Sequence, residues 1–400
     1  MPNPSAPSGA HSRHGPLAGI RILDLSRLLP GPACTLHLAD LGAEVIKVED
    51  TGEGDYARKL GVRPGQTSTY FRAINRNKRS ICLDLKEAAG REAFLRLAAD
   101  AQVVVESFRP GVVDRLGVGY AQVAARNPAI VYCSITGWGQ TGPNRDVAGH
   151  DLNYLALAGV LDQIGVAGGP PALSNLQIAD LLGGALTAAM GILAALVEAR
   201  SMGRGRHLDV AMADAAFAHQ YFALHALATH GTLPPRGRDL LTGGVPCYQV
   251  YPSADGRYLA VGALETKFWH ALCDALERPE LKAKQFATGA EGKATQETMA
   301  AIFASKTQAH WVEALRHVDC CVAPVLTLEE AMRNEQFVRR GMVLGANENE
   351  FQFGPALRLS ESEAFLAGPA PAQGEHTAEV LRAAGFTETE IAALAHATVA

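Results

Sequence analysis

The sequence predicts an α/β protein: a doubly wound domain with a mostly parallel sheet, joined to a smaller α+β domain. Within the first 135 residues, short apolar runs of strand character alternate with helical patterns, as in a parallel sheet covered by helices. Further on, a linker rich in Pro and Gly at 231–244 precedes a hairpin pattern. With 400 residues, 48% of them hydrophobic, the chain is long enough for two domains, or for one large and one small.

The large domain is expected to begin with a βαβ unit. An apolar run at 20–25 is followed by a helical pattern that begins after the sequence Pro-Gly-Pro and by a second apolar run at 43–49. The predicted strands are 20–25, 43–49, 102–108 and 129–135, and the predicted helices are 30–41, 87–99, 181–200 and 210–228.

The small domain is expected to begin with a hairpin. Its strands are predicted at 248–251 and 257–262, on either side of a turn at 253–256 that contains Asp255 and Gly256. Helices are expected near 266–275 and 307–317, and the domain should end around 323–325.

Composition excludes several classes of function. A formal net charge of −5 argues against nucleic acid or an anionic membrane as the main partner. The longest apolar run, 181–197, is rich in Gly and Ala and is flanked by Asp180 and Glu198, so a buried helix is expected rather than a membrane span. Residues 1–16 lack the apolar stretch of a signal peptide and predict a disordered tail. The seven cysteines show no metal-ligand spacing, which predicts reduced thiols in a cytoplasmic protein without a metal site.

An imidazole and a carboxylate stand side by side where an apolar run begins. His150 and Asp151 follow the turn-rich segment 136–143, and Asp180 lies thirty positions beyond His150. Such a pair suits acid/base chemistry. An Asp at the start of a helix can equally serve as an N-cap, so the pair alone leaves both readings open.

The sequence also suggests a phosphate-rich ligand. Glu49 ends the second predicted strand, as in dinucleotide-binding domains, but the turn after the first strand, DLSRLLPGP at 24–32, lacks the glycine fingerprint that a nicotinamide dehydrogenase uses. Arg109 and Arg115 follow the end of another predicted strand, where α/β sheets bind ligands. A further cluster of cations is either a phosphate site or a solvated strand edge, and it consists of Arg72, Arg76, Lys78, Arg79 and Lys86.

Along nearly its whole length the chain resembles the family III CoA transferases, the CaiB/BaiF group. The matching motifs are PLAGIRILDL at 16–25, DLGAEVIKVE at 40–49, NRNKRS at 75–80, FRPG at 108–111, TGWGQTGP at 136–143 and GEHT at 374–377. Within that superfamily, other motifs are most similar to the α-methylacyl-CoA racemases: GHDLNYLALAG at 149–159, LGG at 182–184, GGVP at 243–246, ADG at 254–256 and VGALE at 261–265.

The resemblance implies a Rossmann-like large domain with a small α+β domain, in an interlocked homodimer. The expected parts are a disordered tail at 1–16, the N-terminal part of the large domain at 17–230, the linker and small domain at 231–330, and a return linker with the C-terminal part of the large domain at 331–400. The residues that it implies for CoA binding are Leu83, Asp84, Leu85, Lys86, Ser107, Phe108, Arg109, Pro110, Gly111, Val112, Arg115, Gly149, Leu152, Asn153 and Tyr154. The chain departs from the racemases at Asp50, where they place an Arg, and an insertion with the segment 54–58 looks transferase-like.

The resemblance also implies four catalytic residues. A racemase moves a proton between the two faces of the α-carbon of a thioester, so it needs two acid/base groups, here His150 and Asp180. Glu265 would orient His150, and Asp151 would form a like-charged pair with Asp180 in which one pKa is raised. Backbone amides at the start of the helix that holds Asp180 would stabilise the enolate.

A transferase would instead use Asp180 as a nucleophile that carries an acyl or CoA group. A non-catalytic CoA-binding protein is the third reading, and the intact set of four residues argues against it. The sequence therefore predicts racemisation of 2-methyl-branched acyl-CoA thioesters, with CoA transfer as the alternative. CoA is then part of the substrate and no separate cofactor is expected.

Overall fold

The computed structural model describes residues 15–61, 67–345, 351–360 and 368–396. The tail predicted at 1–16 therefore lies outside the described residues, except for its last two. The chain forms two compact units. The large unit consists of Met1–Ala158, Ser174–His219 and Gly341–Ala400, and the small unit of Gly159–Leu173 and Gln220–Arg340.

The small unit thus includes 159–173 and 220–230, which the sequence interpretation assigned to the large domain. Hydrogen bonds explain why 159–173 belongs to the small unit. The side chain of Gln163 donates to Gln220 over 2.6 Å, and Arg236 donates to the carbonyl oxygen of Gly169 over 2.6 Å and pairs with Asp162.

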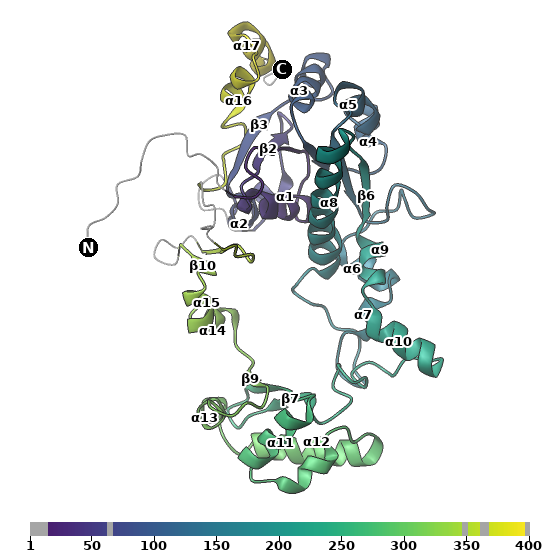
Figure 1. The fold of residues 1–400 in the computed structure, drawn as a ribbon, viewed down its shortest axis with the longest axis vertical. Helices are drawn as coiled ribbons and strands as arrows, with labels where there is room; N and C mark the ends of the chain where they lie inside the picture. The colour runs from purple at the N-terminus through teal and green to yellow at the C-terminus, as the bar shows by residue number, and fades with distance from the viewer. Residues whose placement is uncertain (1–14, 62–66, 346–350, 361–367, 397–400) are drawn as a thin grey trace, which may run out of the picture. The chain divides into compact units, whose positions relative to one another are not determined.

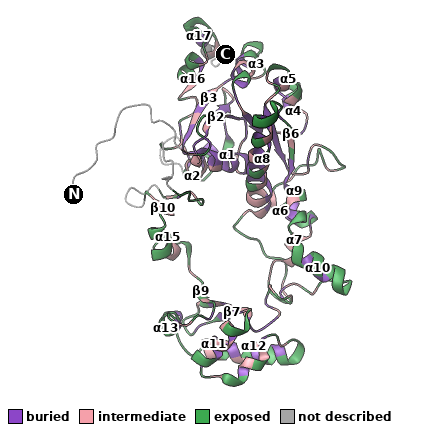
Figure 2. Ribbon diagram, viewed as in Figure 1, coloured by how far each residue is buried: buried purple, intermediate pink, exposed green. Residues whose placement is uncertain are grey.

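The large unit is built on a parallel sheet, which Figure 1 shows among its helices. The sheet has six strands in the order β3-β2-β1-β4-β5-β6. The strands are β1 (Arg21–Asp24), β2 (Glu44–Glu49), β3 (Lys78–Cys82), β4 (Val103–Glu106), β5 (Val131–Thr136) and β6 (His207–Ala211). They are largely buried, as a sheet covered on both faces should be (Figure 2). The order reverses between β1 and β4, and ligands of such sheets bind outside the carboxyl ends of the strands at this point.

Helices cover both faces of this sheet, which confirms the predicted α/β class. One face packs against α1 (Pro30–Asp40) and α8 (Thr187–Met202). The other face shares a core with four helices, through side chains such as Phe94, Val123, Leu381 and Ile391. These helices are α3 (Ala88–Ala99), α5 (Tyr120–Arg126), α16 (Thr377–Ala383) and α17 (Glu388–His396).

The C-terminal part of the chain completes the large unit beside β3. The His376 N–H donates to the carbonyl oxygen of Ser80 over 2.8 Å, and the Gly374 N–H donates to the Ser80 hydroxyl over 2.8 Å. The motif at 374–377 therefore lies along the edge strand of the sheet.

Two helix predictions need correction. The helix expected at 210–228 is wrong at its start, because Val210 and Ala211 extend the sheet as the end of β6, and the helical pattern then divides into α9 (Met212–Ala218) and α10 (Tyr221–His230). The helix expected at 181–200 begins as a π-helical segment, η2 (Ala179–Leu186), before α8. A Cβ on Gly183 would lie 2.7 Å from the carbonyl oxygen of Met212, so glycine permits η2 to approach α9 closely.

By length and composition, Ala179–Met202 could cross a membrane. In this fold it packs against α1, β5 and β6 of the large unit.

The small unit has its own sheet and core. Its strands are antiparallel and consist of β7 (Tyr248–Pro252), β8 (Tyr258–Gly262) and β9 (Val322–Pro324), which confirms the predicted hairpin. Trp269 and Trp311 anchor the core, and the Trp269 indole donates to the carbonyl oxygen of Leu281 over 2.9 Å. The helices of this core are α11 (Thr266–Ala275), α12 (Gly289–Phe303) and α13 (Gln308–Ala314).

Shorter elements connect these parts. They are η1 (Tyr56–Lys59), α2 (Thr69–Asn75), α4 (Val112–Arg115), α6 (Asp151–Leu157), α7 (Val160–Gln163), η3 (Pro279–Lys284), α14 (Leu328–Ala331), α15 (Glu335–Arg339), β10 (Val343–Leu344) and β11 (Gln352–Phe353).

Candidate active site

Two loops meet where the strand order reverses, one after β1 and one after β4. The Arg27 N–H donates to the Ser107 hydroxyl over 3.1 Å. Its guanidinium pairs with Asp50 over 2.7 Å and lies 5.2 Å from the ring centroids of both Tyr56 and Phe108. Asp50, the position at which the chain departs from the racemases, therefore holds a cation from the first loop. Sequence reasoning missed Arg27, although its place directly after the first strand was a usable signal.

A buried carboxyl group at the end of β4 holds the loop that follows this strand. Glu106, the last residue of β4, accepts the Phe108 N–H over 2.7 Å. Burial raises the pKa of Glu106 to about 7, and the nearby charge of Asp114 adds to this shift. Glu106 therefore anchors the loop that carries Phe108 and Arg109.

The cation cluster predicted from the sequence is mostly structural. Arg76 pairs with Asp40, and both side chains are almost fully buried. Lys78 is fully buried between Asp24 and the carbonyl oxygen of Pro32. These two side chains are buried and paired, so for Arg76 and Lys78 neither the phosphate site nor the solvated strand edge is correct. A buried cation requires a carboxylate partner, and the partners come from positions distant in the sequence.

Arg79 is also engaged, in ion pairs with Glu44 and Glu379, over 2.8 and 2.9 Å. Lys86 differs from the rest of this cluster. It is exposed in the loop after β3, and its ammonium group has no ion pair within the described residues.

The residues implied in CoA binding occupy three segments of the large unit. The first, 83–86, follows β3: Leu83 is buried, and the carboxylate of Asp84 accepts the Lys86 N–H over 2.9 Å. The second, 107–112 with Arg115, follows β4 and includes α4. Leu85 and Phe108 pack against the same core, which places these two segments on one side of the sheet.

The third segment begins α6 and contains Gly149, Leu152, Asn153 and Tyr154. Asn153 accepts the His150 N–H over 3.0 Å, and the Tyr154 hydroxyl donates to the carbonyl oxygen of Gly149 over 2.5 Å. Arg109 is close enough for its charge to lower the pKa of Tyr154, although burial raises that pKa to about 12 overall. The structure therefore brings the second and third segments together.

Two of the predicted acid/base residues of the large unit, Asp151 and Asp180, are in contact at the start of η2. His150 immediately precedes α6, and the neighbouring Asp151 accepts the backbone N–H of Asp180 over 3.0 Å. Burial raises the pKa of Asp180 to about 7, and the charge of Asp151 raises it further. Asp180 forms no ion pair within the described part of the chain, so at neutral pH its carboxyl group is present in both protonation states.

Two phenol groups lie near Asp180. Tyr154 comes from α6, and its ring meets Trp138 edge-on at 5.0 Å. Tyr70 comes from α2. Burial, and then the charge of Asp180, raise the pKa of each phenol to about 12, so both stay neutral at physiological pH. Tyr70 was missed from the sequence because nothing in its local pattern links it to a residue 110 positions away.

The expected enolate site is not at the first amides of η2. The amide of Asp180 is bound to Asp151, and that of Leu181 donates to the carbonyl oxygen of Gln177 over 2.9 Å. Neither N–H is available to an enolate oxygen, and this expectation is wrong for both.

Glu265 belongs to the small unit. It is exposed and immediately precedes α11, and its carbonyl oxygen accepts the N–H groups of Phe268 and Trp269. Its predicted action on His150 stays a prediction.

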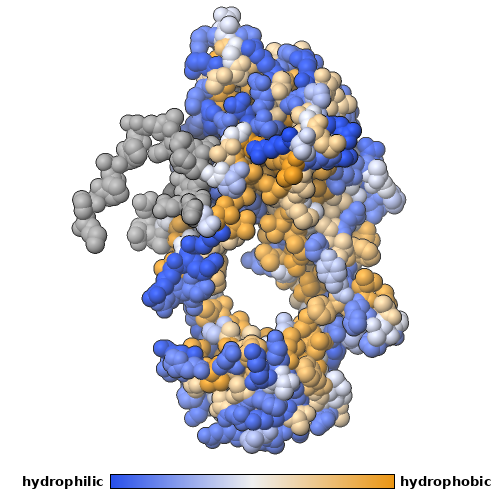
Figure 3. Space-filling view, viewed as in Figure 1, coloured by the Kyte–Doolittle hydropathy of each residue, from blue (hydrophilic) through white to orange (hydrophobic). Residues whose placement is uncertain are grey.

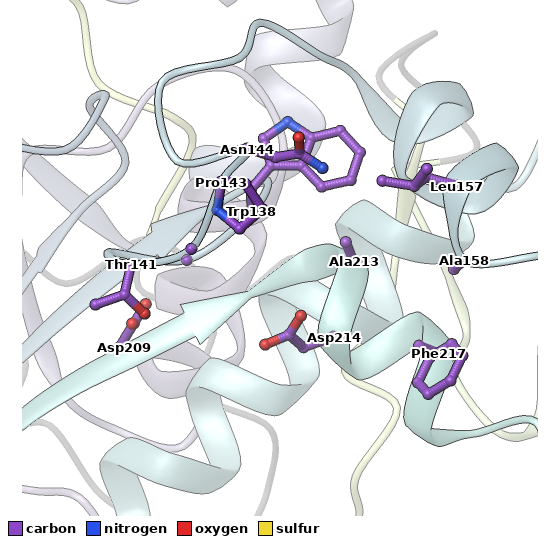
Figure 4. Close-up of a pocket in the computed structure, with 12 residues that line it drawn as sticks. Trp138, Thr141, Pro143, Asn144, Leu157, Ala158, Asp209, Ala213, Asp214 and Phe217 are labelled. Carbon is purple, nitrogen blue, oxygen red and sulfur yellow. The ribbon is translucent and has the colours of Figure 1, made fainter.

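An open pocket adjoins the turn at 136–143 (Figure 4). Thr141 and Asp209 lie at one end, and Leu157 and Phe217 lie at the other. His150 and Asp180 do not line this pocket. Nor do the described residues contain a group of three or more His, Cys, Asp or Glu that could hold a metal ion.

Comparison with known proteins identifies the relatives of this chain. Residues 17–377 match the family described as CoA-transferase family III. The α-methylacyl-CoA racemase of Mus musculus is 38% identical, over 94% of this chain and 95% of that protein. The succinyl-CoA:glutarate CoA-transferase of Mus musculus is 34% identical, over 92% and 86%. A CAIB/BAIF family protein from Brucella suis has a similar structure, with a TM-score of 0.80 and 30% identity over 92% of this chain and 99% of that one.

Proposed function

Because the chain belongs to CoA-transferase family III, we propose that it interconverts the 2R and 2S forms of 2-methyl-branched acyl-CoA thioesters. The observation that carries this proposal is the environment of Asp180. Its carboxyl group has a pKa of about 7, raised by burial and by Asp151, so it can both accept and donate a proton at neutral pH. The similarity to an α-methylacyl-CoA racemase supports the same reaction.

The proposed reaction is a 1,1-proton transfer. The carboxylate of Asp180 or the neutral imidazole of His150 removes the α-proton, and the electron pair of the C–H bond passes into the thioester carbonyl to give an enolate. The other residue, in its protonated form, returns a proton to the opposite face. The reverse direction exchanges the two roles, so each residue acts once as acid and once as base. CoA is part of the substrate, and no separate cofactor takes part.

CoA transfer through a covalent Asp180 intermediate is the second candidate, because several relatives are CoA-transferases. The insertion at 54–58, which resembles the transferases, also favours it. In the structure this segment belongs to the large unit, where Arg58 pairs with Glu49 over 2.6 Å. Against it, a carboxyl group with a raised pKa is only partly ionised at neutral pH, and the carboxylate is the form that attacks a thioester.

Isotope exchange distinguishes the two reactions. In deuterated water, a racemase should incorporate deuterium at the α-carbon of either configuration of a 2-methylacyl-CoA. His150→Gln should slow racemisation in both directions by about 100- to 10,000-fold, the usual contribution of a general acid or base. A transferase should give no α-deuterium and should leave an acyl or CoA adduct on Asp180, detectable by intact mass. Such an adduct, formed with a free carboxylic acid as acceptor, would refute the racemase proposal.

We also propose that the chain forms a homodimer. Large apolar side chains of α8 are exposed in the single chain, among them Met190 (67%) and Val197 (71%). Figure 3 shows apolar surface over this part of the large unit. Monomeric proteins rarely expose contiguous apolar patches of this kind, and a second copy would cover it.

A further inference from the structure

We propose that Arg145 binds a phosphate group of the acyl-CoA, together with Arg115, next to Gly111. A Cβ atom built on Gly111 would lie 3.4 Å from Nη1 of Arg115 and 3.5 Å from Nη2 of Arg145. The two guanidinium nitrogens are therefore no farther apart than the sum of these distances. The inference rests on the proposed function only in taking a CoA ester as the ligand.

The two guanidinium groups have no counter-ion in the described structure. Both arginines are exposed, and neither forms an ion pair or a side-chain hydrogen bond with a described residue. The nearest acidic residue on α4, Asp114, points elsewhere: its Oδ1 lies 2.1 Å from where a Cβ on Gly119 would stand. Two like charges held near each other without a carboxylate repel, and a bound anion converts this repulsion into attraction.

The position of this pair fits a ligand site. Arg115 follows β4 and Arg145 follows β5, and these strands are neighbours in the parallel sheet. Their carboxyl ends therefore open on the same edge, where α/β sheets bind their ligands. Arg109 lies in the loop before Gly111 and is also exposed. Two guanidinium groups from adjacent loops thus lie close together at Gly111, whereas most cations of the predicted cluster are paired internally.

Phosphate is the anion that this arrangement suits best. A guanidinium group presents parallel N–H donors that match two oxygens of a phosphate, and two such groups can share one dianion or a pyrophosphate. A Cβ on Gly111 would touch both guanidinium groups, and its φ of 79° favours glycine, so no side chain at this position covers them. Arg145 also lies only five residues before His150, so one loop carries both the proposed phosphate contact and the proposed base.

Binding of free CoA tests the inference independently of catalysis. Dissociation constants of CoA, dephospho-CoA and pantetheine would be measured by calorimetry for the unmodified protein and for the variants Arg145→Ala and Arg145→Lys. The control variant is Arg316→Ala, because Arg316 is an exposed arginine in the turn after α13. We expect Arg145→Ala to weaken CoA by about 10- to 100-fold, as for loss of a charge-assisted hydrogen bond. Arg145→Lys should retain part of the affinity, and pantetheine, which has no phosphate, should bind equally to all four proteins.

The ligand series identifies the phosphate. An equal loss for CoA and dephospho-CoA places Arg145 at the pyrophosphate, whereas a loss confined to CoA places it at the 3′-phosphate. Because both arginines act on the same anion, Arg115→Ala and Arg145→Ala should be non-additive when combined. Unchanged CoA affinity in Arg145→Ala, or an equal loss for pantetheine, would overturn the inference. If CoA binding follows this pattern but no α-deuterium is incorporated, only the proposed reaction fails.

Discussion

The carboxylate of Asp151 accepts the backbone N–H of Asp180 over 3.0 Å, so two acidic residues 29 positions apart are fixed next to each other at the start of η2. The contact supplies a hydrogen-bond acceptor to a helix terminus and a negative charge to the neighbouring carboxyl group. Both effects can be tested separately.

Replacing Asp151 by Asn keeps the acceptor and removes the charge. The pKa of Asp180 should then fall, since the charge of Asp151 is one of the two causes that raise it. We expect the limb of the kcat/KM profile near pH 7 to move to lower pH in Asp151→Asn. Asp151→Ala also removes the acceptor and should cost about 1 kcal/mol of stability, as for loss of a helix cap. A profile that does not move in the Asn variant would contradict the pairing.

The stability of Asp180→Asn relative to the unmodified protein should depend on pH. In the folded protein the pKa of Asp180 is raised from 3.8 to about 7, so the unmodified protein is relatively most stable below pH 4 and loses that stability as pH rises to about 7. The Asn variant has no such loss. Calorimetry should therefore show that the Tm of Asp180→Asn minus the Tm of the unmodified protein increases from pH 4 to pH 7. Above pH 7 this difference should stay constant. A difference that does not vary with pH would show that Asp180 titrates normally.

Glu106 should position the loop after β4 for CoA. Glu106→Ala removes the acceptor of the Phe108 N–H and should raise KM for the acyl-CoA more than it lowers kcat. Glu106→Gln retains an acceptor oxygen and should restore most of the affinity. If both variants bind CoA like the unmodified protein, the contact is only structural.

Arg109 and Arg76 should behave in opposite ways. Arg109 is exposed, so Arg109→Ala should weaken CoA binding by about 1.5 to 3 kcal/mol without changing Tm. Arg76 is buried with Asp40, so Arg76→Ala leaves an unpaired buried charge and should cost about 3 to 5 kcal/mol of stability. Calorimetric binding and thermal unfolding of both variants check this contrast. Normal CoA affinity in Arg109→Ala would exclude Arg109 from the site.

The exposed apolar side chains of α8 should lie in a dimer interface. Native mass spectrometry at nanomolar concentration should find a dimer, and Met190→Glu with Val197→Glu should weaken it, because charges would be buried at the interface. The control, Arg316→Ala, should leave it intact. A reversible monomer at micromolar concentration would contradict the proposal, and recovery of the chain with lipid vesicles would instead assign this surface to a membrane.

Local sequence pattern was enough to predict the βαβ alternation and the hairpin of the small unit. Both depend on interactions between neighbouring residues: apolar runs of strand length, a helix whose first residues are Pro-Gly-Pro, and a turn around Asp255 and Gly256. The same pattern misassigned Val210 and Ala211, because an apolar, Ala-rich segment suits either a helix or a buried strand. Pairing with β5 decided in favour of the strand.

The sequence by itself determined the fold class, the family motifs and the residue types available for acid/base chemistry. The tertiary structure decided which charges are free to act. The sequence gives no sign that Arg76 and Lys78 differ in environment from Arg109 and Arg145. In the structure, carboxylates from another helix and another strand pair with Arg76 and Lys78, whereas Arg109 and Arg145 are exposed. The raised pKa of Asp180 likewise comes from burial by packed elements and from a residue 29 positions away. Such effects depend on distances through space, which spacing along the sequence does not contain.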